Sequence, residues 1–188
     1  MKKDLVDELI ELSLSMFRKN FFGIFHGSLS AKLEGERFVI NTKDAIFDEL
    51  TKDDFITIYY KEDYRYKTAS IDSYIHRQIY QDITDAKYIC YAMPHNIISY
   101  SLAHDVFHPK DYFASQRYPE LKIYDPQEFK NWYNRAPEEI SNYLKNTHDV
   151  MIIRGYGIFT YSRDLKELVK KIAIVENSAK LLINSSRY

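Results

Sequence analysis

The sequence predicts an α/β fold, and two of its features carry this prediction. Short apolar runs of strand length alternate with longer segments whose apolar residues recur every three or four positions, as on one face of a helix. The chain has 188 residues, of which 45% are hydrophobic, enough to bury a core without disulfide or metal staples. We therefore expect residues 1–188 to form a single domain.

The N-terminal half is expected to hold two helices and several strands. Residues 4–19 read as a helix, because Leu5, Leu9 and Met16 fall on one face. Residues 70–83 read as a second helix, which Ser70 begins and in which isoleucines recur every four positions. The expected strands are 28–33 and 37–41, which form a hairpin around Glu34-Gly35, 55–60, a short segment at 64–66 that pairs beside it, and 88–92.

The C-terminal half is expected to begin with an irregular region. We interpret residues 107–133 as an ordered loop packed by its aromatic side chains, because prolines interrupt it. A helix should start at Asp125-Pro126-Gln127-Glu128, and a further helix should run from Pro137 to about Asn146. Strands are expected at 150–153 and 158–161, and a last helix, capped by Ser162, carries the stripe Leu165, Leu168, Ile172, Val175, Ala179 and Leu182.

Composition excludes several classes of protein. Basic and acidic residues number 26 and 27, so no strong positive field favours nucleic acid, and the aromatic segment interleaves Arg117 and Lys130 with acids such as Glu120 and Glu128. The single cysteine, Cys90, excludes an internal disulfide and a cysteine-rich zinc site. No apolar run reaches the roughly 18–20 residues that a membrane span requires.

The start of the chain does not resemble a secretory signal. Met-Lys-Lys is followed by acidic residues, among them Asp4, Asp7 and Glu8, which interrupt any apolar stretch. We therefore expect a cytoplasmic protein.

Two pairs of residues have spacings that could serve chemistry. His104 and His108 are four apart, as zinc ligands on a helix can be, but Pro109 follows and no third ligand is spaced to them, so a solvated or packed pair is favoured. Asp72 and His76 are also four apart at a helix start. Asp72 is interpreted first as a residue that complements the helix dipole, and second as a general acid/base that projects into a cleft.

Five segments, taken in order, resemble the class II aldolase/adducin family over nearly the whole chain. They are Gly27-Ser28-Leu29-Ser30-Ala31-Lys32, Phe38–Phe55 with its Asn41-Thr42 and Leu50-Thr51, Ser70-Ile71-Asp72-Ser73-Tyr74-Ile75-His76, Ile89-Cys90-Tyr91-Ala92-Met93-Pro94, and Ile152-Ile153-Arg154-Gly155-Tyr156-Gly157. The resemblance implies a three-layer α/β/α sandwich around a central, mostly antiparallel sheet. It also implies a homo-oligomer, commonly a tetramer, with sites between subunits.

The resemblance also implies a reaction whose machinery this sequence has partly replaced. The family's aldolases and epimerases act on sugar phosphates with a divalent metal held by three histidines, which fall here on Tyr91, Met93 and Tyr156. A thioether suits zinc poorly, and a phenol must lose a proton before it binds a cation well. The family's glutamate falls on Asp72. Of the phosphate-binding positions, Ser70 is kept, an asparagine falls on Ser28, a Thr-Gly pair on Lys43-Asp44, and a serine on Ile71.

These replacements favour a domain that has lost the zinc site and with it the aldolase reaction, and that acts by binding or assembly. No cofactor is then expected, although a small sugar-phosphate-like ligand remains possible, and Tyr91 and Tyr156 should close the old metal cavity with hydroxyls bonded to each other or to Asp72. The alternative is an active aldehyde-lyase or epimerase. It would use zinc on relocated ligands from His95, His104 and His108, or metal-free acid/base chemistry by Asp72.

Overall fold

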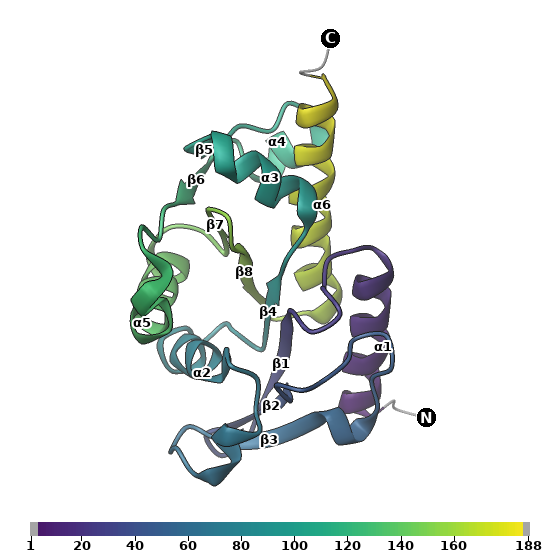
Figure 1. The fold of residues 1–188 in the computed structure, drawn as a ribbon, viewed down its shortest axis with the longest axis vertical. Coiled ribbons are helices and arrows are strands. Elements are labelled where there is room, and N and C mark those ends of the chain that lie inside the picture. Colours follow the sequence, from purple (N-terminus) through teal and green to yellow (C-terminus); the bar gives the residue numbers. More distant parts are fainter. Residues whose placement is uncertain (1–3, 186–188) are drawn as a thin grey trace.

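Eight strands form a central sheet in the order β3-β2-β1-β4-β8-β7-β6-β5 (Figure 1). This computed structural model describes residues 4–185, so the Met-Lys-Lys start and the outer ends of the expected 1–188 domain lie outside the described residues. Neighbouring strands are antiparallel except for the parallel pair β6–β7. The strands are β1 Ser28–Leu33, β2 Arg37–Asn41, β3 Phe55–Tyr59, β4 Tyr88–Ala92, β5 Val106–Phe107, β6 Leu121–Tyr124, β7 Val150–Ile153 and β8 Gly157–Ser162.

Helices cover both faces of this sheet. In Figure 1, α2 and α5 lie on one side of it, and α1 and α6 on the other. Each side has its own apolar core, and α3 and α4 pack with α6 around a third. The expected three-layer α/β/α sandwich is therefore confirmed. The helices are α1 Leu5–Arg18, α2 Ser73–Asp82, α3 His95–Ala103, α4 Tyr112–Arg117, α5 Trp132–Asn146 and α6 Leu165–Ser185, with short 3-10 helices at Lys52–Asp54, Tyr64–Lys67 and Phe129–Asn131.

Strand β1 separates a polar face from an apolar one. Leu29 and Ala31 point into the core below α1 and α6. Ser28 and Ser30 alternate with them, so they point to the opposite face, where both bond to side chains of α2. This alternation places two small hydroxyl residues beneath α2, at the place where the candidate site forms.

Two expectations for the N-terminal half need correction. Residues 64–66 belong to a 3-10 helix and do not pair with β3, because the Asp63 side chain accepts the Arg65 amide and turns the chain. Helix α2 begins at Ser73, not at Ser70, whose carbonyl accepts the Ser73 amide in a preceding turn.

The aromatic region 107–133 is more regular than expected. It contains α4, which Asp111 caps by accepting the Ala114 amide, and strand β6. No separate helices begin at Asp125 and Pro137. Instead α5 runs through Pro137, because Trp132 and the residues that follow it on the same face form one buried stripe that outweighs the hydrogen bond lost at the proline.

Helix α3, which follows β4, has no counterpart among the elements expected from the sequence. The last helix is capped by Asp164, which accepts the Glu167 amide, whereas Ser162 accepts the Asp164 amide one step earlier. Among the described helices, none combines the length and apolar character needed to cross a bilayer.

Candidate functional site

A cavity of about 200 Å³ lies where the ends of β4 and β7, the start of α2 and the start of α5 meet. Seven residues singled out from the sequence line it, namely Lys43, Ser70, Ile71, Asp72, Tyr91, Met93 and Tyr156. The structure therefore brings these separate motifs together. The cavity also has lining residues that sequence reasoning did not assign to a site, namely Phe25, His26, Asn41, Thr42 and Tyr133.

Asp72 is the buried charge of this cavity. Its side chain is only 2% exposed, and although Asp72 stands at the N-cap position of α2, its carboxylate makes no capping hydrogen bond to the helix. Its Oδ2 accepts a hydrogen bond from Ser28 at 2.9 Å, while its Oδ1 is buried without a partner. Burial raises the pKa of Asp72 to about 6, and the Ser28 and Tyr156 hydroxyls only partly oppose that rise.

Asp72 is the first member of a buried chain of hydrogen bonds. Ser28 Oγ also lies 2.8 Å from Nε2 of His76, and Nδ1 of His76 lies 2.7 Å from Ser30 Oγ. Ser30 in turn lies 2.7 Å from the Tyr80 hydroxyl. Burial lowers the pKa of His76 to about 3, so its imidazole is neutral at ordinary pH. The carboxylate of Asp72 and the imidazole of His76 are therefore linked through Ser28.

Tyrosine rings form the opposite wall. Tyr91 stacks on Tyr156 with ring centroids 4.8 Å apart, and on Phe159 at 4.9 Å. The Tyr91 hydroxyl donates to the backbone carbonyl of Tyr156 at 3.0 Å, and the Tyr156 hydroxyl pairs with that of Tyr133 at 3.0 Å. The expectation that these hydroxyls bond to each other or to Asp72 is met only in part: stacking places the Tyr91 hydroxyl beside the Tyr156 backbone, whereas the Tyr156 hydroxyl acts on Asp72 and lowers the pKa of that carboxyl.

Comparison with known proteins identifies the family. The family model of the class II aldolase and adducin N-terminal domain matches residues 7–183. The chain belongs to the class II aldolase and adducin family.

Several solved structures have a similar fold over most of the length of this chain. The L-fuculose-1-phosphate aldolase of Thermus thermophilus has a TM-score of 0.84 at 20% identity, covering 94% of this chain and 91% of that one. The sugar-phosphate aldolase of Thermotoga maritima has a TM-score of 0.73 at 12% identity, with coverage of 95% and 93%. The N-terminal class II aldolase domain of a Thermoplasma acidophilum protein has a TM-score of 0.71 at 16% identity, with coverage of 97% and 95%.

The residues at the family's metal positions do not fit a divalent cation. Tyr91 and Tyr156 have their hydroxyls engaged in the hydrogen bonds above, and their rings stack against each other. Burial and the neighbouring Asp72 charge raise the pKa of both phenols, which opposes the phenolate form that a cation requires. Met93 adds a thioether, a poor zinc ligand. This donor set does not support the family's metal-held chemistry.

The histidines considered as replacement ligands each have other surroundings. His104 follows the end of α3 and stacks on Tyr100, and His108 lies beside Glu120 at 3.7 Å. His95 is the first residue of α3. Across residues 4–185, no three His, Cys, Asp or Glu side chains gather as a metal site would need.

The family's phosphate positions are occupied by groups with other partners. Ser28 bonds to Asp72 and His76, and Ser70 Oγ accepts the Asp72 amide at 3.3 Å. Ile71 is 59% exposed at the mouth of the cavity. Lys43, which occupies one position of the replaced Thr-Gly pair, lines the cavity and is exposed.

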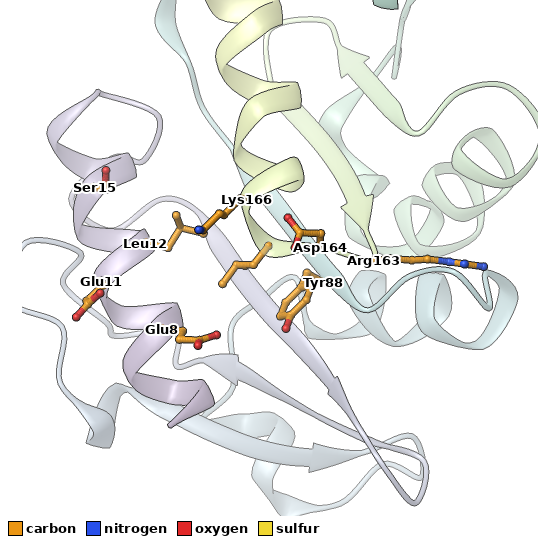
Figure 2. A pocket seen from close by; sticks show the side chains of 9 residues that line it. Glu8, Glu11, Leu12, Ser15, Tyr88, Arg163, Asp164 and Lys166 are labelled. Atoms are coloured by element: carbon orange, nitrogen blue, oxygen red, sulfur yellow. The ribbon is translucent and has the colours of Figure 1, made fainter. Parts of the chain in front are cut away.

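A larger cleft of about 520 Å³ lies between α1 and the start of α6 (Figure 2). Glu8 and Leu12 line it from α1, Tyr88 from β4, and Lys166 from α6. Arg163 also lines the cleft, and its guanidinium forms an ion pair with Asp85. In the part of the chain that the structure describes, no residue of this cleft has a buried polar atom without a hydrogen-bond partner. The smaller cavity does have one, which is Asp72 Oδ1. The Asp72 cavity is therefore the candidate site.

Proposed function

We propose that this member of the class II aldolase and adducin family has lost the metal-dependent aldolase reaction and acts through binding or assembly. The observation that carries the proposal is the stacked Tyr91–Tyr156 pair, which occupies two of the three metal positions with rings whose hydroxyls are already bonded. A small polar ligand is the expected occupant of the remaining cavity, because its volume is below the range of about 300–1,000 Å³ that is typical of drug-sized ligands.

Metal content per chain tests this proposal. Protein purified without a histidine tag and offered zinc, manganese and cobalt should hold well under one metal ion per chain by elemental analysis. The matched control is the triple variant Tyr91→His, Met93→His and Tyr156→His, which restores imidazole at all three positions and should bind more zinc than the parent. One tightly held ion per chain in the parent would overturn the proposal.

Asp72 supports a second candidate function, metal-free acid/base catalysis in an aldehyde-lyase or epimerase that acts on a sugar phosphate. The free Oδ1 and a pKa of about 6 suit a group that accepts and returns a proton near neutral pH. If turnover of a sugar phosphate is found, Asp72→Asn should abolish it while the fold is retained. Unchanged turnover in Asp72→Asn would eliminate this candidate. Zinc takes part in this alternative only if relocated ligands from His95, His104 and His108 hold it.

We also propose that the chain assembles as a homo-oligomer, a tetramer by family resemblance, in the cytoplasm. Apolar side chains at the cavity mouth support assembly, since Phe25 and Ile71 are each 59% exposed and Phe129 packs at 6.0 Å on Tyr156 while itself 49% exposed. Light scattering coupled to size exclusion measures the mass directly. A monomer at all concentrations would contradict assembly, and Ile71→Asp should weaken any oligomer that forms through this mouth.

A further inference from the structure

The hydrogen-bond chain beneath the cavity is built from two elements in register. Asp72, at the start of α2, and two α2 residues that follow at four-residue intervals, His76 and Tyr80, point toward β1, where Ser28 and Ser30 occupy alternate positions. Each of the four contacts measures between 2.7 and 2.9 Å, and all five residues are buried. The chain therefore exchanges no hydrogen bonds with bulk water, and its protons can be counted.

The count gives the chain one direction when Asp72 is ionised. A carboxylate only accepts, so the single hydroxyl proton of Ser28 goes to Asp72 Oδ2. Ser28 must then accept from His76, which places the imidazole proton on Nε2. The Nδ1 atom is left as an acceptor for Ser30, and Ser30 accepts from the Tyr80 hydroxyl. Every donor in the chain is used, and every one points toward Asp72.

The opposite direction leaves a buried donor unused. If Asp72 carried its proton on Oδ2, each bond would reverse, and the Tyr80 hydroxyl would have to donate elsewhere. Ser30 is the hydrogen-bond partner of that hydroxyl, and Tyr80 is 1% exposed, so reversal would strand an O–H group in the interior. Protonation of Asp72 on Oδ1 leaves the direction of every bond unchanged, because Oδ1 takes no part in the chain.

We propose that Ser28, His76, Ser30 and Tyr80 form a hydrogen-bond relay of fixed direction that locks Asp72 Oδ2 and reserves Oδ1 as the one carboxylate atom through which the cavity exchanges protons. His76 is a positioning residue in this arrangement, acting on Asp72 through Ser28. A ligand hydroxyl or ammonium group donates a hydrogen bond to Oδ1 of the ionised carboxylate, and the same atom holds the proton that Asp72 takes up from water at low pH. The relay itself keeps its direction throughout.

The relay also defines what the cavity recognises, a refinement that depends on the proposed ligand-binding role. An ionised Asp72 offers the ligand one acceptor and no donor, so it selects a donor-bearing group. Other ionisable groups surround the carboxylate from each element packed against it. They are Cys90 and Tyr91 on β4, Tyr133 on α5 and Tyr156 between β7 and β8, whose pKa values are raised first by burial and then by the Asp72 charge. His76 on α2 and the cavity-lining His26 and Lys43 complete the set.

Nitrogen NMR of the ligand-free protein tests the relay without any metal or ligand. In ¹⁵N-labelled protein, long-range ¹H–¹⁵N correlations distinguish a protonated Nε2, which couples to both ring carbon-bound protons, from a protonated Nδ1. His76→Gln assigns the signal by its loss. We expect the Nε2–H form at pH 8 and also at pH 5, where Asp72 is protonated. An Nδ1–H form, or an imidazolium with both nitrogens protonated, at either pH would overturn the proposal.

Two variants separate the relay from simple packing. Ser28→Ala disconnects His76 from Asp72, so an Nδ1–H population should appear while the imidazole remains neutral. Tyr80→Phe is the control, because Ser30 still donates to Nδ1 without the tyrosine hydroxyl, and the Nε2–H form should persist. Retention of the pure Nε2–H form in Ser28→Ala would show that the carboxylate does not set the tautomer. Since no metal is involved, this result and the metal-content result stand or fall separately.

Discussion

The Tyr91 ring stacks on both Phe159 and Tyr156, and its hydroxyl donates to the backbone carbonyl of Tyr156. One side chain therefore joins β4 to the turn between β7 and β8 in two ways, by stacking and by a hydrogen bond. The same pair fills two positions at which the family resemblance assigns metal ligands. At this position Tyr91 contributes packing, which predicts that its mutation changes stability.

Replacing Tyr91 should separate these two contributions. Tyr91→Phe keeps the stack and removes one hydrogen bond, so we expect a loss of about 1 kcal/mol in the free energy of unfolding. Tyr91→Ala also removes a 6% exposed ring and should cost about 3–5 kcal/mol. Urea denaturation measures both. Tyr112→Ala, at a ring that is 73% exposed, is the control and should change stability by less than about 0.5 kcal/mol. Equal losses for the Phe and Ala variants would contradict the stacking role.

Asp72 should make stability depend on pH. Its pKa rises from 3.8 to about 6 on folding, so the folded state holds a proton that the unfolded state releases between these values. The Asp72 contribution is therefore greatest below pH 3.8 and falls as the pH rises through 6, by about 3 kcal/mol. Asp72→Asn removes this dependence. The free energy of unfolding of the variant, relative to that of the parent, should therefore increase from pH 4 to pH 7.

His76 acts in the opposite direction over the same range. Its pKa falls from 6.5 to about 3 on folding, so its contribution is complete above pH 6.5 and is lost as the pH falls toward 3. In the parent the two groups nearly cancel between pH 3.8 and 6, and Asp72→Asn should reveal the His76 slope. Urea denaturation at pH 4, 5, 6 and 7 measures it, with Asp53→Asn at an exposed carboxylate as the control. Parallel curves for Asp72→Asn and the parent would refute the assignment.

Much of the fold is predictable from the sequence because strands carry strong local signals. The hairpin strands at 28–33 and 37–41 and the buried strands at 88–92 and 150–153 have the bounds that the sequence predicts, since β-branched and aromatic runs end there at turn residues. The prediction of an irregular loop over 107–133 is wrong because the elements of this region are short and depend on tertiary packing. Even so, Asp111 before α4 is a usable capping signal.

The candidate site is only partly predictable. The family resemblance locates Asp72, Tyr91 and Tyr156, but Tyr133 enters the cavity through the packing of α5, which no local pattern encodes. The spacing of Asp72 and His76 indicates a shared helical face, whereas the link between them is supplied by Ser28 from β1. Such contacts depend on the register between a helix and a strand, and periodicity alone does not define it.

Glu176 should stabilise α3 from outside that helix. This α6 carboxylate accepts hydrogen bonds from the amides of Asn96 and Ile97 and from the Asn96 side chain, and so satisfies donors at the start of α3. Glu176→Ala should lower the free energy of unfolding by about 1–3 kcal/mol and speed amide exchange in α3. Glu176→Gln should have an effect between those of the parent and Glu176→Ala. Exposed Glu138→Ala is the control. Exchange in α3 that is unaltered by Glu176→Ala would argue against the capping role.

Gly157 should tolerate no side chain, because it follows Tyr156 where β8 approaches β4. A Cβ at this position would lie 2.4 Å from the backbone oxygen of Ala92 and 2.8 Å from the Tyr91 ring, and the backbone has φ of +156°. Gly157→Ala should therefore cost about 3 kcal/mol or more, since both overpacking and backbone strain oppose it.

Gly35→Ala is the matched control. Gly35 also has a positive φ, +73°, but a Cβ there would meet nothing within 4 Å, so strain alone should cost about 1–2 kcal/mol. Thermal and urea unfolding of both variants measures the difference. Equal losses would mean that β8 can move away from Ala92, in which case the position of Tyr156 against Tyr91 would not be fixed by this glycine.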